Sequence, residues 1–271
     1  MEEKNWGCLK QTAIGCGVLI VITIVIPIVM GVLMMGPFNR AVDARHAIEE
    51  RFGTQEAYVP PASGAPSSDR IGAFLELRRT FGEVCADLSN AEQQVQKLES
   101  FDDQDDVNTV DALKQALSTT KSMMGVGPVI GRFYEIRNQS LLDAGMGLGE
   151  FTYIFTLAYR DRLLDGPEPY MLFGPSPINR RVRQTLLTML ESQLAVLKSE
   201  GGTETEVAAL NAEIAAMKAD EGRIPWQDET PPAIIEALAP YRAEFDELYC
   251  PAMAPLELMI NVKHGPAVES L

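Results

Sequence analysis

The sequence predicts an all-α protein in which a single N-terminal transmembrane helix is followed by a soluble helical-bundle domain. Three observations support this fold class. Residues 11–39 contain no charged side chain, and a run of this length can cross the hydrocarbon core of a bilayer. Beyond residue 69, apolar residues recur at spacings of three and four, as they do on amphipathic helices. No segment alternates apolar and polar residues over a convincing strand length.

The uncharged run is interpreted as an uncleaved membrane anchor over residues 12–36, preceded by a tail over residues 1–11. The apolar core of a signal peptide is shorter, about 7–15 residues, and a cleavage site follows it. Basic residues flank the run almost evenly, so the shortness of the tail, and not its charge, favours a cytoplasmic N-terminus. We therefore expect a bacterial inner-membrane protein with a periplasmic domain.

Ala13 and Gly17 are candidate contacts with a partner helix in the membrane. They form a small-xxx-small pair, which allows two helices to approach closely. Small residues near a helix end are an equally good explanation of the pair.

Residues 37–68 are predicted to form a juxtamembrane helix and then a linker rich in proline and serine. The helical domain is predicted over residues 69–249, and its helices are bounded by glycine, proline and capping signals. They are expected near residues 69–100, 107–124, 129–143, 148–164, 178–200, 203–219 and 230–249.

Individual residues set several of these boundaries. Gly201 and Gly202 are predicted to end one helix, and Thr203 with Glu206 predicts a capping box for the next. Thr230, which precedes a proline, is predicted as the N-cap of the last helix.

Residues 250–271 are interpreted as a C-terminal tail. Its apolar run is too short to span a membrane and too interrupted by proline for a long helix. Left in water, this run would be an exposed apolar patch, so it must cover its own domain or a neighbour. Leu256, Met259 and Ile260 are therefore candidate partner contacts.

Cys85 and Cys250 are a candidate disulfide in the soluble part. They could pair in an oxidising compartment, or remain free thiols in the core. Sequence alone does not give the distance between them, so both alternatives stay open.

Arg180, Arg181 and Arg183 crowd the start of a predicted helix, where the helix dipole disfavours cations. They are candidate contacts with lipid headgroups or an acidic partner. Ion pairs within this acidic chain explain them equally well.

Gly145, Gly147 and Gly149 alternate in the segment DAGMGLGEF. A dinucleotide-binding loop needs a different glycine spacing after a strand, and a Walker loop needs Gly-Lys-Ser or Gly-Lys-Thr. Gly145 suits a left-handed helix cap, and the other two are candidate sites of close helix packing.

The longer segment RNQSLLDAGMGLGEFTYIFTLAYRDRL resembles a stretch of uncharacterised, membrane-anchored helical proteins of Acidobacteria and Gemmatimonadetes. In that family an arginine-bearing helix leads into a Gly-Met-x-Leu-Gly-Glu-Tyr-like turn, where this chain has Phe151 in place of the tyrosine. The resemblance covers roughly residues 132–163 and implies no activity.

No residues are predicted as catalytic, metal-binding or cofactor-binding. The chain has only two histidines and no recognisable nucleophile or metal motif. One set of carboxylates, Glu135, Asp143, Glu150 and Asp161, is interpreted as a network of ion pairs that fixes helix register. The net charge of −15 repels phosphate backbones, which argues against nucleic-acid binding.

These observations favour a non-enzymatic, membrane-anchored accessory or scaffold subunit of a larger bacterial membrane complex. A respiratory assembly or a photosynthetic reaction centre with its antenna is an example of such a complex. The alternative is a periplasmic ligand-binding or sensory domain on a membrane anchor.

Overall fold

The computed structural model describes residues 26–99, 127–164 and 180–258, and within these ranges every regular element is helical. This confirms the all-α class for the described part of the chain. No helix there combines the length and the apolar character needed to cross a membrane. Most of the predicted anchor, including Ala13 and Gly17, lies outside the described residues, as does the helix predicted near 107–124.

The helical elements follow one another in order along the chain. They are α2 (Ile26–Phe52), η2 (Gln55–Ala57), α3 (Ser68–Arg79), α4 (Gly82–Glu99), a helix over residues 127–143, α6 (Leu148–Ala158), α7 (Arg160–Leu164), α8 (Arg180–Ser199), α9 (Glu204–Ala219), α10 (Pro232–Leu238), η3 (Ala239–Tyr241), α11 (Arg242–Leu248) and α12 (Ala254–Leu258).

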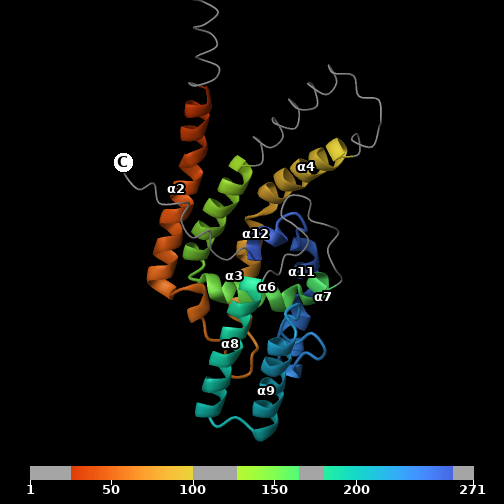
Figure 1. Ribbon diagram of the computed structural model, residues 1–271. Helices are drawn as coiled ribbons and strands as arrows, with labels where there is room; N and C mark the ends of the chain where they lie inside the picture. The colour runs from red at the N-terminus through yellow and green to blue at the C-terminus, as the bar shows by residue number, and fades with distance from the viewer. Residues whose placement is uncertain (1–25, 100–126, 165–179, 259–271) are drawn as a thin grey trace, which may run out of the picture.

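Helix α6 lies at the centre of the domain, between the α8–α9 hairpin on one side and α3, α4 and α12 on the other (Figure 1). All its residues from Leu148 to Leu157 are buried except Glu150. A helix that is apolar nearly all round belongs in a core. The first turns of α2 project at the end of the molecule opposite the tip of the α8–α9 hairpin.

The apolar stripe predicted near residues 69–100 is buried, but two helices share it. Phe74, Phe81 and Leu88 are all buried. The chain leaves the first helix at Thr80, whose hydroxyl donates a hydrogen bond to Leu77 O at 2.7 Å. The stripe continues across the break because both helices face the same core.

The α8–α9 hairpin follows the predicted signals. Gly201 has a φ of +78°, a conformation that glycine adopts without strain, and Gly202 N donates to Leu197 O at 2.8 Å. The capping box of Thr203 and Glu206 is present at the start of α9, so that prediction is confirmed.

The last predicted helix differs from the structure at its start and in the middle, and ends as predicted near Tyr249. Pro231, and not Thr230, is the N-cap of α10. The 3-10 turn Ala239–Tyr241 separates α10 from α11. Pro240 in this turn has no N–H to continue an α-helix, which explains the interruption. The helix predicted near 148–164 likewise divides at Tyr159.

The structure moves both predicted domain boundaries. Residues 250–258 belong to the domain, because Met253, Ala254 and Leu258 are fully buried and α12 forms among them. At the other end, Gln55 and Gly64 of the predicted linker are buried against the domain. The Tyr153 hydroxyl donates to Gly64 O at 2.8 Å, so this segment is fixed in place.

Candidate functional site

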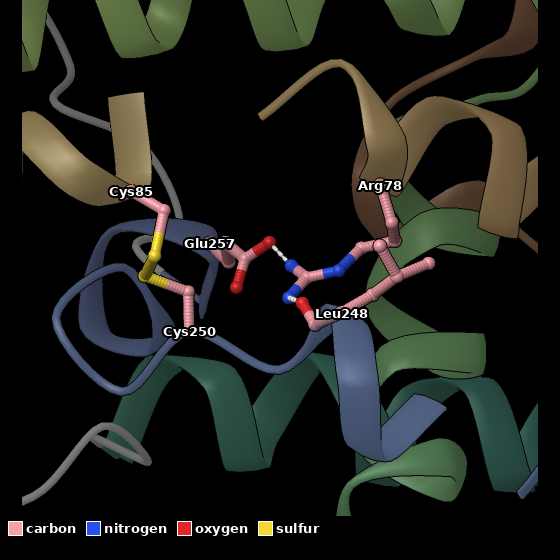
Figure 2. Close-up of a disulfide and its surroundings, with 5 residues drawn as sticks. All are labelled: Arg78, Cys85, Leu248, Cys250 and Glu257. Carbon is pink, nitrogen blue, oxygen red and sulfur yellow. Dashed lines mark hydrogen bonds and ion pairs between the residues drawn. A yellow bond between two sulfur atoms is a disulfide. The ribbon is translucent and has the colours of Figure 1, made fainter. Parts of the chain in front are cut away.

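Two interactions hold the C-terminal segment against the domain, and we call them together the C-terminal clamp. The first is the disulfide between Cys85 on α4 and Cys250, which follows α11; the two Cα atoms are 6.0 Å apart. The second is an ion pair between Arg78 on α3 and Glu257 on α12 (Figure 2). The structure therefore decides between the two alternatives for the cysteines in favour of the disulfide.

The ion pair of the clamp is completely buried, with side-chain exposures of 0% for both Arg78 and Glu257. Arg78 Nη2 also donates to Leu248 O at 2.6 Å, and its guanidinium carbon lies 5.4 Å from the ring centre of Phe155 and 5.1 Å from that of Tyr159. Burial lowers the pKa of Arg78. Burying a charge is costly unless it is paired and hydrogen-bonded, and the aromatic faces stabilise the cation further. If α12 left the core, Arg78 would lose its counterion.

Sequence reasoning missed this pair. The available signal was Arg78 itself, a cation at the position between Leu77 and Phe81 on an otherwise apolar helix face. Nothing in the local sequence identifies Glu257, 179 residues later (257 − 78), as its partner.

A second buried arginine, Arg137, touches the same C-terminal helix. Its Nε and Nη2 donate to Asn138 Oδ1 at 3.1 and 3.0 Å, and Nη1 donates to Leu256 O at 3.5 Å. Burial lowers the pKa of Arg137 to about 10. Asn138 in turn donates to Ala41 O at 2.7 Å, which connects α2 to this cluster.

The carboxylates predicted as one network form separate ion pairs instead. Glu135 pairs with Arg40, at 2.9 Å. Glu150 accepts two hydrogen bonds from Arg70, at 2.6 and 2.7 Å. Asp143 differs, because it accepts a hydrogen bond from Gln139 of its own helix at 2.9 Å. Asp161 pairs with its neighbour Arg160 at 2.7 Å, and the four carboxylates do not form one network.

The glycine segment is a site of close packing. Gly145 has a φ of +59°, the left-handed conformation that the sequence predicts. A Cβ on Gly147 would lie 2.9 Å from Phe52 Cβ, at the end of α2. A Cβ on Gly149 would lie 2.4 Å from Gln55 O and 2.5 Å from Tyr58 Cβ. Because these two glycines have no side chain, the end of α2 and the segment that follows it pack directly against their backbone.

The arginines at the start of α8 have different environments. Arg180 is exposed and pairs with Glu221 at 2.9 Å. Arg181 is also exposed, and it too interacts with another group of the protein. Arg183 is buried and donates to Met217 O. This corrects the prediction for Arg183, because its guanidinium satisfies carbonyl groups at the end of α9 and does not face solvent.

Leu256 is also corrected as a partner contact. It is buried in its own domain, with 1% of its surface exposed. The apolar run of the predicted tail therefore covers its own core, at least as far as Leu258. Met259 and Ile260 lie outside the described residues.

A cleft of about 250 Å³ opens where α7, α10 and α11 meet the end of α6. Its walls combine apolar side chains with charged ones of both signs. The lining residues are Leu157, Ala158, Tyr159, Arg160, Asp161, Arg162, Thr230, Ile234, Ile235, Leu238, Arg242, Phe245 and Asp246. From the sequence, only Tyr159, Arg160 and Asp161 are candidates for a common polar site. The residues that α10 and α11 contribute lie about 80 positions further along the chain.

The backbone next to the cleft is strained at Trp226, which has a φ of +59°, a rare value for a bulky residue. Trp226 N donates to Glu213 Oε1 at 2.9 Å, and Glu213 also accepts two hydrogen bonds from Arg223. The hydrogen bond to Glu213 raises the pKa of Arg223. Trp226 O then accepts from Arg160 at 2.9 Å, so this loop fixes one wall of the cleft.

The fold and these sites define a disulfide-bonded, all-helical domain whose C-terminal segment is locked onto its core. No group of three or more potential metal ligands occurs in residues 26–99, 127–164 or 180–258. Comparisons of the chain with protein-family models, curated proteins and solved structures found no match.

Proposed function

We propose that this protein is a non-enzymatic accessory subunit of a larger bacterial membrane complex, anchored by residues 12–36 with its helical domain outside the cytoplasm. The observation that carries the location is the Cys85–Cys250 disulfide. Disulfides persist in oxidising compartments and are rare in the cytosol of mesophiles. Residues 11–39 without a charge supply the anchor.

The connection between anchor and domain supports a scaffolding role. Helix α2 runs from Ile26 to Phe52 without interruption, so its N-terminal turns belong to the uncharged run and its C-terminal turns belong to the domain. Ile48 is buried in the core, and Ala41 O accepts from Asn138. A domain joined to its anchor through one helix stays close to the bilayer, which suits a subunit that contacts its neighbours there.

The charged groups of the domain support binding and structure over catalysis. The carboxylates near the glycine segment are all engaged in hydrogen bonds or ion pairs with neighbouring side chains. General acid–base catalysis needs a group that is free to exchange a proton with a substrate. Two of these pairs, Arg70–Glu150 and Arg40–Glu135, join separate helices, as an interaction scaffold requires.

A native gel of membranes solubilised in mild detergent tests the proposal. The tagged protein should migrate in a complex well above its own mass of 29.7 kDa, together with other membrane proteins. Gly17→Leu should weaken this co-migration, because a large side chain separates closely packed helices, while the protein stays in the membrane. Val18→Leu is the matched control and should co-migrate normally.

Two outcomes would contradict the proposal. A full-length protein that runs alone in mild detergent is not a stable subunit of a complex. A protein that is recovered in the soluble fraction has no anchor.

A further inference from the structure

The cleft between α7, α10 and α11 has the size and the floor of a small-ligand site. Its volume of about 250 Å³ is just below the roughly 300–1,000 Å³ of sites for drug-sized ligands, so a compact molecule fits it. Ile234, Leu238 and Phe245 form an apolar floor from α10 and α11. Ile235 at the edge is 47% exposed, an apolar surface that a ligand could cover.

Two opposite charges of the cleft have unused hydrogen-bonding capacity. Arg242 makes a single ion pair within the described residues, with Nη1 3.9 Å from Asp161 Oδ2, which is too long for a hydrogen bond. Asp246 accepts through Oδ1 from Arg162 at 3.2 Å, which leaves its second oxygen available. Arg242 and Asp246 are four residues apart on α11, so they lie on one face of that helix.

A third polar group adds to this pair. Thr230 lines the cleft, and its hydroxyl is buried in the wall without a hydrogen-bond partner among the described residues. A hydroxyl can donate to an anion or accept from a cation.

The distribution of charge selects the class of ligand. The cleft is lined by three arginines and by two aspartates, Asp161 and Asp246, so neither a simple cation nor a simple anion satisfies both signs of charge. A zwitterion has no net charge and can satisfy both signs at close range. Guanidinium groups bind carboxylates in a two-pronged geometry, and a carboxylate accepts from an ammonium group.

We propose that this cleft binds a small zwitterion with an apolar side group, of the hydrophobic α-amino-acid class. Arg242 binds the carboxylate of the ligand and Asp246 its ammonium group, while the side group covers the apolar floor. All the lining residues of the cleft belong to this domain, so the site depends neither on the anchor nor on partner subunits. Failure of the ligand-binding proposal therefore leaves the proposed subunit function intact, and the reverse also holds.

Titration calorimetry of the purified full-length protein tests the site with four probes that differ by one group each. L-leucine should bind saturably. 4-Methylpentanoate lacks the ammonium group, 3-methylbutylamine lacks the carboxylate, and glycine lacks the side group. Each should bind about tenfold more weakly or worse, because each leaves one part of the site unfilled.

Variants place the binding in the cleft. Arg242→Gln and Asp246→Asn should each weaken L-leucine binding about tenfold, and both side chains are more than two-thirds exposed (69% and 67%), so the fold tolerates these changes. Arg180→Gln removes another exposed arginine, outside the cleft, and should bind like the parent protein.

Three results would overturn the inference. They are no saturable binding of L-leucine, binding of 4-methylpentanoate as tight as that of L-leucine, and unchanged affinity in Arg242→Gln and Asp246→Asn. The last would place the amino acid elsewhere on the protein.

Discussion

The close approach at Gly149 predicts that a single methyl group destabilises the domain. In Gly149→Ala the new Cβ would lie 2.4 Å from Gln55 O, a backbone atom that cannot rotate away. The Gln55 side chain is itself fixed, because its Nε2 donates to Thr152 at 2.5 Å in the buried core. The segment after α2 must therefore shift before alanine can fit.

The sign of the effect follows from two opposing terms. Replacing a helical glycine by alanine gains up to about 1 kcal/mol in chain entropy and helix propensity. Overpacking a tight core costs about 1–3 kcal/mol, and here the clash involves backbone as well as side chain. We expect Gly149→Ala to lower the free energy of unfolding by about 1–2 kcal/mol.

Gly72→Ala is the matched control. Gly72 lies within α3, and no heavy atom would lie within 4 Å of its added Cβ. The same chemical change should therefore raise the free energy of unfolding by about 0.5–1 kcal/mol. The two variants should shift in opposite directions from the parent and differ from each other by roughly 1.5–3 kcal/mol.

Urea unfolding followed by circular dichroism measures both variants against the parent protein. A Gly149→Ala protein as stable as Gly72→Ala would refute the close approach. ATP and NAD should leave every midpoint unchanged; a nucleotide-dependent shift that Gly149→Ala abolishes would favour a phosphate-binding loop instead.

Three further changes probe the domain. The disulfide closes a loop with a sequence separation of 165, and its reduction should lower the free energy of unfolding by about 2–5 kcal/mol. The urea midpoint should therefore fall when a reductant is added, and an unchanged midpoint would count against the disulfide. Glu257→Gln should cost about 3–5 kcal/mol, because it leaves Arg78 buried without a counterion, and a melt within 1 °C of the parent would contradict this. Thr203→Ala should cost about 1 kcal/mol through the lost cap of α9. Hydrogen bonds from Thr203 lower the pKa of Glu206, so their stabilisation is present above the ordinary pKa of Glu206 and is lost as the pH falls through the lowered value. The difference between the parent and Thr203→Ala should therefore narrow in acid without vanishing, because the bond from Glu206 N to Thr203 Oγ1 does not titrate.

The sequence predicts the elements whose signals are local. The capping box at Thr203 lies within four residues of chain, and the glycines that end α8 adjoin it. The all-α class follows from apolar spacing that repeats within each helix. These features need no knowledge of the rest of the fold.

The features that sequence reasoning missed depend on residues far apart in the chain. The role of Leu256 could not be decided, because an apolar tail can cover its own domain or a neighbour. Arg183 stood out at the start of a helix, but the carbonyl groups it satisfies lie on α9. The charged walls of the cleft meet only after α7 and α11 have packed together.

The side of the membrane on which the domain lies is the most direct test of the account. A single reporter cysteine at Ser68, which is exposed at the start of α3, is placed in a protein in which Cys8 and Cys16 are replaced by serine. Asn5→Cys, in the tail before the anchor, is the matched control.

A membrane-impermeant maleimide is then added to intact cells whose outer membrane has been made permeable. The account predicts that the cysteine at position 68 is labelled before lysis, whereas the cysteine at position 5 reacts only after lysis. Labelling at position 68 that appears only after lysis would place the domain in the cytoplasm and contradict the account.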